Sequence, residues 1–490
     1  MKKFDHVVIG SGISGLTAAI ILGKFGKKVA LIEQYSNTAP LIRRFKRGNS
    51  WCDPGFHYSG GLHDSGPLTI LLRYLGVAEN IKILPMDSNG FDILSFKGEN
   101  EYIIPYGFDH LQDYLCHNFP NSSKAVKQYI ENVKDINFNT AFMNPDKPFT
   151  EFSSEIYMNN SLESYLKSVG AEQKMIDLLG NHGYVLYGSN ASEVPMYTHA
   201  YIMGSFYKSS SLVVDGGNGL VNAFESELKK YNISVFTNCS VSGFEIDEKR
   251  VLKGVYCEDE NYFVCDSCIS TIHPKLLIGM LADTSVRPAY INRIDKLENT
   301  MASVVLFLEA DVYPNQVLTT NYYEFDSSVT ASVNETGYIA YMSVNPQSES
   351  EGKRSFTVIK PVSGSLFEPY FGEKYFNDYE NYSIIKNQIT DRILKQVIDK
   401  FPELRGQARV LEVSTPVTYN RYTKTVNGSM YGVKQNIAQR GLTTRTSVHN
   451  LYLAGQSIQM GVMGSIISGF IATLNMVDSV QLEKEIRQCH

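Results

Sequence analysis

The feature that most constrains this chain is a glycine-rich turn that joins a short apolar strand to a helix near the N-terminus. Residues 4–9 have the composition of a buried strand, and residues 16–25 carry apolar side chains at helical spacing. The turn between them has the sequence Gly10, Ser11, Gly12, Ile13, Ser14, Gly15. A strand, this glycine spacing and a helix, in this order, form the fingerprint of a dinucleotide-binding βαβ unit. The chain is therefore predicted to be an α/β protein.

Each glycine of the turn has a separate task in such a unit. Gly10 permits the tight turn, Gly12 lets the backbone approach a pyrophosphate, and Gly15 lets the helix pack on the strand. The backbone N–H groups around Ser11 and Ser14 lie at the helix start, where they have no partner within the helix and attract phosphate oxygens. The turn is thus predicted to bind the phosphates of a nucleotide.

An acidic residue completes the nucleotide end of the site. Residues 29–32 form a second apolar strand, and Glu33 closes it. A carboxylate at this position can accept hydrogen bonds from both ribose hydroxyls. Because strand, glycines, helix, strand and acid all occur in order, the pattern is much more specific than a glycine triplet alone.

A segment near the C-terminus favours a flavin over a nicotinamide. Residues 451–454 have the pattern of a strand that ends at Gly455 and Gln456, and an apolar helix containing Gly464 follows. The positive end of that helix suits the electron-rich pyrimidine edge of a flavin. The fingerprint itself is shared by FAD and NAD proteins, so this segment decides for FAD.

Five further motifs are spread along the chain, at residues 51–58, 215–220, 235–241, 270–274 and 415–422. Together with the fingerprint they resemble the phytoene desaturase, carotenoid isomerase and retinol saturase family of FAD-dependent oxidoreductases, over nearly the whole sequence. The resemblance implies that the strand ending at Val241 contacts the adenine through its backbone. It also implies noncovalent FAD, and no cysteine lies between Gly428 and Met476 to form a cysteinyl link there.

The resemblance implies a Rossmann-type FAD-binding domain, of the glutathione-reductase-like or amine-oxidase-like kind, with an inserted α+β substrate domain. The FAD-binding domain is expected to be discontinuous, with residues 1–75, 210–275 and 445–490, and the substrate-binding domain to comprise residues 76–209 and 276–447. Within the latter, apolar or alternating patterns predict strands of one sheet at residues 303–309, 337–344 and 355–362. Helices are predicted at residues 119–143 and 382–401.

The chain departs from the family at one place. A double glycine usually follows the ribose acid there, often with a basic residue near the pyrophosphate, but this chain has Ala39 and Pro40. Proline lacks an N–H donor, so a backbone contact to the cofactor is expected to be missing. Arg43 or Arg44 is the candidate replacement cation; the alternative is a solvated basic surface.

His57 and Tyr58 are the candidate catalytic residues, because the resemblance places their segment near the flavin. Either could donate a proton to a substrate carbanion, and the alternative is a packing role between the domains. Cys265 and Cys268 form a CxxC pattern at a strand end, with no second pair to complete a tetrahedral site, so no metal is predicted. Candidates to line an apolar tunnel are Tyr322, Tyr323, Phe367, Tyr370 and Phe371, and the alternative is ordinary core and surface packing.

The expected function is an FAD-dependent oxidoreductase that acts on carbon–carbon double bonds of a conjugated apolar substrate, an isoprenoid or polyene, as saturase, desaturase or isomerase. One alternative is an amine-oxidase-like flavoenzyme, since the fold does not fix the reaction. Another is a prenyl-lipid carrier of the GDP-dissociation-inhibitor type without catalysis. The intact fingerprint and Glu33 favour an enzyme.

Composition bears on partners and location. A net charge of −6 gives no basic surface for nucleic acid. Seven scattered cysteines favour a reducing compartment, and no run of about 18 apolar residues predicts a transmembrane helix. We expect a cytoplasmic protein, in peripheral contact with a membrane if its substrate is held there, while the oligomeric state stays open.

Overall fold

The computed structural model describes residues 2–99, 101–149, 158–281, 286–326, 337–348, 353–439 and 441–490. Its first sheet has the strand order β10-β2-β1-β13-β12-β11, and β20 pairs with β13. The strands are β1 (Lys2–Ile9), β2 (Val29–Ile32), β10 (Ser234–Phe236), β11 (Val241–Ile246), β12 (Leu252–Cys257), β13 (Tyr262–Ser270) and β20 (Leu451–Leu453). The strands β10, β2, β1, β13 and β20 run parallel to one another, while β12 and β11 extend the sheet as antiparallel strands. This is the predicted dinucleotide-binding sheet.

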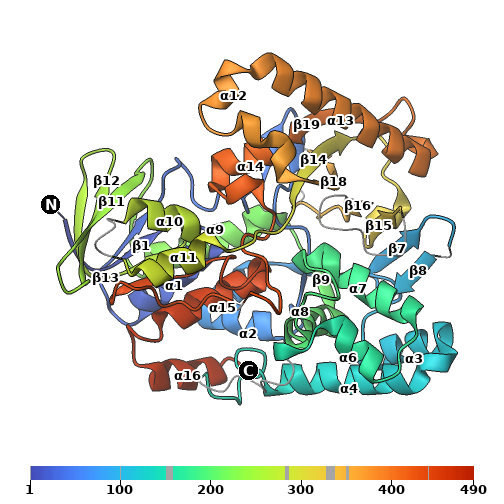
Figure 1. Ribbon diagram of the computed structural model, residues 1–490, viewed down its shortest axis with the longest axis horizontal. Coiled ribbons are helices and arrows are strands. Elements are labelled where there is room, and N and C mark those ends of the chain that lie inside the picture. Colours follow the sequence, from blue (N-terminus) through green and yellow to red (C-terminus); the bar gives the residue numbers. More distant parts are fainter. Residues whose placement is uncertain are drawn as a thin grey trace.

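A second sheet, of mixed strand direction, lies on the other side of the molecule (Figure 1), with the order β19-β14-β18-β16-β15-β7-β8. Its strands are β7 (Asp92–Phe96), β8 (Glu101–Ile104), β14 (Ala302–Glu309), β15 (Asn321–Phe325), β16 (Tyr338–Met342), β18 (Phe356–Val362) and β19 (Arg409–Ser414). Two small sheets are β17-β4-β3 and β5-β9-β6. Their strands are β3 (Phe45–Arg47), β4 (Ser50–Cys52), β5 (Ser59–Gly60), β6 (Ile83–Pro85), β9 (Ser210–Val213) and β17 (Lys353–Arg354).

The helices fall into groups that cover the two large sheets (Figure 1). Those associated with the first sheet are α1 (Ile13–Lys24), α2 (Pro67–Leu75), α9 (Gly216–Lys230), α10 (Pro274–Met280), α11 (Pro288–Asp295), α15 (Gly461–Thr473) and α16 (Ser479–Arg487). A second group is α3 (Phe108–Asn118), α4 (Ser123–Asn139), α6 (Leu162–Ser168), α7 (Gln173–Tyr187) and α8 (Met196–Lys208). The second sheet is capped by α12 (Lys374–Asn377), α13 (Tyr379–Lys400) and α14 (Pro416–Thr423).

Most predicted elements are present, and two predictions need correction. The three predicted strands of the insert are β14, β16 and β18, and they are neighbours in one sheet. The alternation read from residues 337–344 is misleading, however, because every residue of β16 is buried. Residues 235–241 are not one strand, since β10 ends at Phe236 and β11 begins only at Val241. In the described part of the chain no helix combines the length and apolarity needed to cross a membrane.

The core of the first domain is built around α1 and α15, which cross at small residues. The Ser14 hydroxyl lies 2.9 Å from the Ser468 hydroxyl, and a Cβ at Gly469 would approach the Ser14 carbonyl oxygen to 2.7 Å. Larger side chains would force the helices apart. The N-termini of both helices are thereby held beside each other at the same edge of the sheet, where β1 and β20 end.

Candidate active site

One cavity of about 460 Å³ extends from the ends of the parallel strands to the face of the second sheet. Sequence-predicted residues that line it are Gly10, Gly12, Ser14, Glu33, His57, Tyr58, Val241, Gly455, Gln456 and Gly464. Ser11, Gly15, Arg43 and Arg44 do not line it. Segments that are distant in the sequence therefore meet at one site, as the resemblance implied.

The fingerprint turn has the conformation that its glycines permit. Gly10 has a φ of 91°, and a Cβ there would collide with the Thr271 hydroxyl. A Cβ at Gly15 would collide with the Gly10 carbonyl oxygen, so close packing of α1 on the turn requires glycine. Gly10 and Gly15 are therefore needed for the shape of the turn. Gly12 is not needed for its shape, because a Cβ there would meet no protein atom.

The space in front of Gly12 is open. A Cβ at Gly12 would meet no atom within 4 Å, although the residue caps α1 and lies in a crowded part of the fold. The helix begins there without a side-chain cap, so no capping side chain accepts a hydrogen bond from its first backbone N–H groups. An unfilled space before free N–H donors at a helix start is what a pyrophosphate requires. The turn therefore fits a dinucleotide.

Glu33 is buried at the end of β2 and held in place by its neighbours. One carboxylate oxygen accepts hydrogen bonds from the Ser11 N–H at 2.9 Å and the Ser11 hydroxyl at 2.6 Å. The other accepts from the Tyr35 N–H at 3.0 Å. Because Glu33 also lines the cavity, its remaining acceptor capacity is available to a ligand hydroxyl. Ser11, which does not line the cavity, thus orients the Glu33 carboxylate.

The segment that departs from the family keeps a glycine-like backbone. Ala39 has a φ of 49°, in the left-handed region where glycine is usual, and its N–H donates to the Ser11 hydroxyl at 3.0 Å. Ala39 and Pro40 both line the cavity. The chain therefore retains the conformation of this turn without the glycine, at a cost of order 1 kcal/mol in backbone strain.

The two arginines after this turn have partners away from the cavity. Arg43 forms an ion pair with Glu225 at 2.8 Å and hydrogen bonds to Asn222. Arg44 is buried and makes two bonds to Asp53, at 2.7 and 3.0 Å. In this structure they join the turn to α9 and to the loop after β4 and stand outside the cavity wall.

The second helix start lies opposite the first. Gly455 has a φ of 104° and its N–H donates to the Ser468 hydroxyl at 2.9 Å, which fixes the turn after β20. Residues 461–465, the first turn of α15, line the cavity and have no side-chain cap. The cavity therefore has two helix N-termini in its wall, both of which favour electron-rich groups.

Beyond the nucleotide part, the cavity wall is mainly apolar and aromatic. The phenylalanine and tyrosine side chains that line the cavity are Phe56, Tyr58, Tyr201, Phe206, Tyr323, Tyr338, Tyr419, Tyr422 and Tyr431. Among described lining residues, the charged or ionisable acid and base side chains are Glu33, Lys424, His57 and His273. Glu33 is the single carboxylate among them, and it belongs to the nucleotide part. The other aromatic candidates singled out in the sequence do not line the cavity: Tyr322, Phe367, Tyr370 and Phe371.

The two candidate catalytic residues differ in their surroundings. Burial lowers the pKa of His57, so its ring is neutral at neutral pH, and it makes no hydrogen bond to any described residue. Tyr58 donates to Asp92 at 2.9 Å and its hydroxyl lies 3.0 Å from that of Tyr323. Burial, reinforced by Asp92, raises the pKa of Tyr58 well above its usual value.

Behind Tyr58 lies a buried polar group that sequence reasoning missed. Asp92 is fully buried and accepts hydrogen bonds from His182 at 2.8 Å and Asn321 at 2.8 Å, in addition to Tyr58. The three partners come from different parts of the chain, so no local motif joins them. The available signal was Asp92 itself, an acid placed at the start of an apolar strand.

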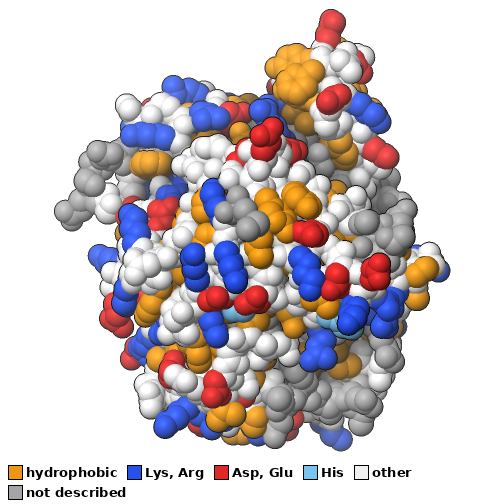
Figure 2. Space-filling view, turned by 90° about the vertical axis from the view of Figure 1, so that its left-hand side faces the viewer, with side chains coloured by type: hydrophobic (Ala, Val, Ile, Leu, Met, Phe, Trp, Pro, Cys, Tyr) orange, Lys and Arg blue, Asp and Glu red, His pale blue; other side chains and the backbone are white. Residues whose placement is uncertain are grey.

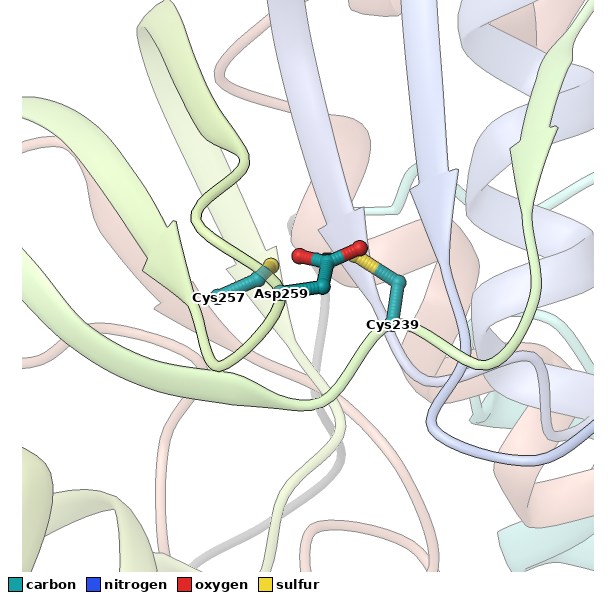
Figure 3. Close-up of side chains that lie close together, drawn as sticks. All are labelled: Cys239, Cys257 and Asp259. Carbon is teal, nitrogen blue, oxygen red and sulfur yellow. Dashed lines mark hydrogen bonds between the residues drawn. The ribbon is translucent and has the colours of Figure 1, made fainter.

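A cluster of two cysteines and an aspartate lies at the nucleotide end (Figure 3). The carboxylate of Asp259 stands between the sulfurs of Cys239 and Cys257, and the three ligand atoms lie within 4.8 Å of one another. Burial raises the pKa of both thiols. Cys239 also lines the cavity. The CxxC cysteines, Cys265 and Cys268, are buried separately in β13, and no metal-ligand group in the described part of the chain includes them.

Comparison with known proteins agrees with this geometry. The chain is 22% identical to the all-trans-retinol 13,14-reductase of Danio rerio, with 99% of this chain and 87% of the relative covered. It is also 22% identical to the chloroplastic prolycopene isomerase of Daucus carota, with 99% and 82% covered. An oxidoreductase structure from Methanosarcina mazei shares the fold, with a TM-score of 0.64, 16% identity, and 96% and 99% of the chains covered.

A sequence profile of the family described as flavin containing amine oxidoreductase matches residues 13–473. The match spans both helix starts of the cavity, the first at Ile13 in α1 and the second in α15. It also includes the aromatic chamber and the two large sheets, apart from β1. This chain belongs to the flavin-containing amine oxidoreductase family.

Proposed function

We propose that this chain is an oxidoreductase that binds FAD noncovalently and acts on carbon–carbon double bonds of a conjugated apolar substrate. The observation that carries the proposal is the continuity of one cavity, from the fingerprint turn into an aromatic chamber that has no carboxylate of its own. A flavin in the first part supplies hydride chemistry. The chamber supplies a dry, apolar place for a polyene.

Three residues in the nucleotide part of the cavity favour a dinucleotide cofactor. Glu33 stands ready for ribose hydroxyls, Gly12 for the pyrophosphate, and Val241 lines the wall where adenine is expected. Noncovalent binding is favoured because no cysteine belongs to the α15 segment. The one lining cysteine, Cys239, adjoins Ser240 and Val241, and burial keeps its thiol protonated.

A polyene substrate is favoured by the relatives and by the wall. The names of the aligned relatives refer to retinol and to prolycopene, both conjugated isoprenoids. Each buried CH₂ group contributes about 0.8 kcal/mol, so a long apolar chain gains most of its affinity from such a wall. A carboxylate is one partner for a protonated amine, and the chamber offers none among its described residues.

The experiment begins with the protein as purified. We expect a yellow protein whose flavin is released by acid and identified as FAD; a colourless protein would indicate a carrier. The photoreduced protein is then mixed anaerobically with all-trans-retinol, prolycopene, or putrescine, and flavin absorbance is followed. Reoxidation by a polyene supports the proposal. Reduction of oxidised protein by the amine, followed by peroxide release when oxygen is admitted, would establish the amine oxidase alternative.

Peripheral membrane contact is part of the proposal, because isoprenoids are poorly soluble. Exposed apolar side chains lie on η5 (Gly364–Tyr370), α12, α13 and α14, which pack against one another. They include Leu366, Phe376, Tyr379, Ile384 and Tyr422, of which Phe376 is 73% exposed. Tyr422 also lines the cavity. The protruding upper part of Figure 2, at the height of α12 in Figure 1, carries hydrophobic side chains among charged ones.

Vesicle co-sedimentation tests this contact. Uncharged phosphatidylcholine vesicles are suitable, because the chain carries a net charge of −6. We expect Phe376→Ser to reduce the bound fraction. Phe138→Ser is the matched control, because Phe138 is a 63% exposed aromatic residue on α4, at the opposite end of the molecule. Equal binding by both variants would remove the α12 surface from the proposal.

A further inference from the structure

We propose that Asp92, His182, Tyr58 and Tyr323 form a proton relay that delivers a proton to the substrate chamber. This inference rests on the proposed function, because saturation of a carbon–carbon double bond needs a proton as well as a hydride. The flavin supplies the hydride, and nothing in the cofactor fixes where the proton comes from. The relay is the buried polar system that reaches the chamber wall.

The relay is a continuous series of hydrogen bonds. His182 Nε2 lies 2.8 Å from Asp92 Oδ2, and the Tyr58 hydroxyl lies 2.9 Å from the same oxygen. The Tyr323 hydroxyl lies 3.0 Å from that of Tyr58. Asp92 and His182 are at most 1% exposed, whereas Tyr58 and Tyr323 line the cavity. One end is therefore sealed in the core and the other meets the substrate space.

The core end is fixed by neighbours that do not themselves ionise. Asn321 donates to the second oxygen of Asp92 at 2.8 Å, and its own carbonyl accepts from the Ser343 N–H at 2.9 Å. The ring of Phe91 covers the His182 ring at 5.7 Å. Buried polar groups are costly unless satisfied, and here each oxygen of the carboxylate has a donor. The carboxylate is thus held in one position, as a relay requires.

His182 has one unusual feature. Its Nδ1 is buried and has no hydrogen-bond partner among described residues. A buried histidine is normally satisfied at both nitrogens, whereas this ring makes its one hydrogen bond to Asp92 and packs against Phe91 and Tyr207. Through Nε2 the ring holds the Asp92 carboxylate in place.

The hydrogen bonds of the relay can run in either of two directions. The two states of the relay differ by one proton. In the first, Tyr58 donates to Asp92 and Tyr323 donates to Tyr58, so both hydroxyl protons point away from the chamber. When the Asp92–His182 pair has gained a proton, Asp92 donates to Tyr58 and Tyr58 donates to Tyr323. The Tyr323 proton is then free to enter the chamber. Burial raises the pKa of both tyrosines, so each hydroxyl keeps a proton between transfers.

The proposed step balances as follows. After a hydride has added to one carbon of the double bond, an electron pair remains on the other. That pair takes the Tyr323 proton, so a C–H bond forms and an O–H bond breaks. Tyr58 reprotonates Tyr323 and Asp92 reprotonates Tyr58, which leaves Asp92 as a carboxylate hydrogen-bonded to the neutral His182 ring. The relay ends one proton poorer and regains it from water when the product leaves. Asp92 and His182 are positioning residues, since they act through the tyrosines.

The first test is spectroscopic and needs no turnover. In protein labelled with ¹⁵N-histidine, the proton on His182 Nε2 is assigned by its loss in His182→Gln. We expect Tyr58→Phe to shift this resonance, because Tyr58 and His182 share one oxygen of Asp92. Tyr201→Phe is the matched control, because Tyr201 lines the same cavity with a buried, unpaired hydroxyl. An unshifted resonance in Tyr58→Phe would overturn the relay.

The second test measures a single turnover of reduced protein with all-trans-retinol. Tyr323→Phe is expected to lower the rate of product formation by about 10²-fold or more, the usual contribution of a general acid. Tyr341→Phe is expected to keep the wild-type rate, because Tyr341 has a buried hydroxyl without a hydrogen-bond partner in the described part of the chain and lies outside the cavity wall. Equal rates in both variants, with an active wild type, would overturn the relay alone. Failure of the wild type to react with any polyene would instead overturn the proposed function.

Discussion

Ser11 donates both its backbone N–H and its hydroxyl to one carboxylate oxygen of Glu33, at 2.9 and 2.6 Å. This pairing turns the second residue of the fingerprint into a support for the ribose acid. Because the Ser11 hydroxyl also accepts from Ala39, it links the glycine turn, the acid and the segment after it. Three predicted parts of the nucleotide site are thus held by one hydroxyl.

Replacement of Glu33 by alanine should weaken FAD binding by roughly 1.5–3 kcal/mol, the scale of hydrogen bonds to a charged group. The carboxylate lines the cavity and has acceptor capacity beyond its bonds to Ser11 and Tyr35. The flavin dissociation constants of the wild type and the variants, measured at equal salt concentration, test this prediction. Glu258→Ala is the control, since Glu258 is an exposed acid at the edge of the same sheet. Equal constants for both variants would remove Glu33 from the binding site.

Gly12→Val should abolish FAD binding and leave the fold intact. The new side chain would occupy the open space before the α1 N-terminus, where the pyrophosphate is expected, and would meet no protein atom at its Cβ. Flavin content and thermal unfolding are measured together. Gly243→Val is matched, because its Cβ also meets nothing within 4 Å but lies in β11, outside the cavity wall. Full flavin content in Gly12→Val would place the cofactor elsewhere.

Gly15→Ala should instead destabilise the protein, because its Cβ would collide with the Gly10 carbonyl oxygen. A forced shift in a packed core costs about 1–3 kcal/mol. Chemical denaturation of the cofactor-free protein measures this loss. Gly12→Ala serves as the reference, since its space is open. A cofactor-free Gly15→Ala protein as stable as Gly12→Ala would contradict the role of Gly15 in packing α1 on the turn.

Acidification should destabilise the fold through His199. Its ring is buried between the hydroxyls of Tyr129 and Tyr187, at 2.7 and 2.9 Å, and burial lowers its pKa from 6.5 to about 3. Between these values the unfolded chain binds a proton that the folded protein excludes. The free energy of unfolding therefore falls as pH falls from 6.5 toward 3, by about 1.4 kcal/mol per pH unit from this group.

Denaturation curves across that pH range test the assignment. In His199→Gln the slope of the unfolding free energy against pH should be smaller by the contribution of about one proton. We expect this even though the variant is less stable at pH 7. His449→Gln is the control, because His449 is exposed. A slope unchanged by His199→Gln would show that other groups cause the acid sensitivity.

Cys239 and Cys257 should resist alkylation in the folded protein. Burial raises the pKa of both thiols, and the thiolate is the reactive form. Mass spectrometry after brief iodoacetamide treatment at pH 7.5 should find both unmodified until the protein is unfolded. Since the Asp259 carboxylate adds to the raised pKa of each, Asp259→Asn should speed their modification. Rapid labelling of both in the native protein would contradict the buried cluster in Figure 3.

The nucleotide part of the site could be predicted from sequence because its tasks are local. Gly10, Gly12 and Glu33 act within one βαβ unit, and their spacing is fixed by strand and helix lengths. The resemblance implied one strand over residues 235–241, but this segment spans the end of β10, a loop and the start of β11. Asp92 and His182 could not be joined in advance, since α7 meets β7 only through tertiary packing.

The crossing of α1 and α15 through Ser14, Ser468 and Gly469 also sets an order of events during synthesis. The phosphate turn is synthesised before the second helix start of the cavity, which lies more than 440 residues later, at Gly461. The βαβ unit of the fingerprint therefore keeps part of the cavity wall open until α15 has been made. The two-helix wall is completed only by a contact between segments that are far apart in the sequence.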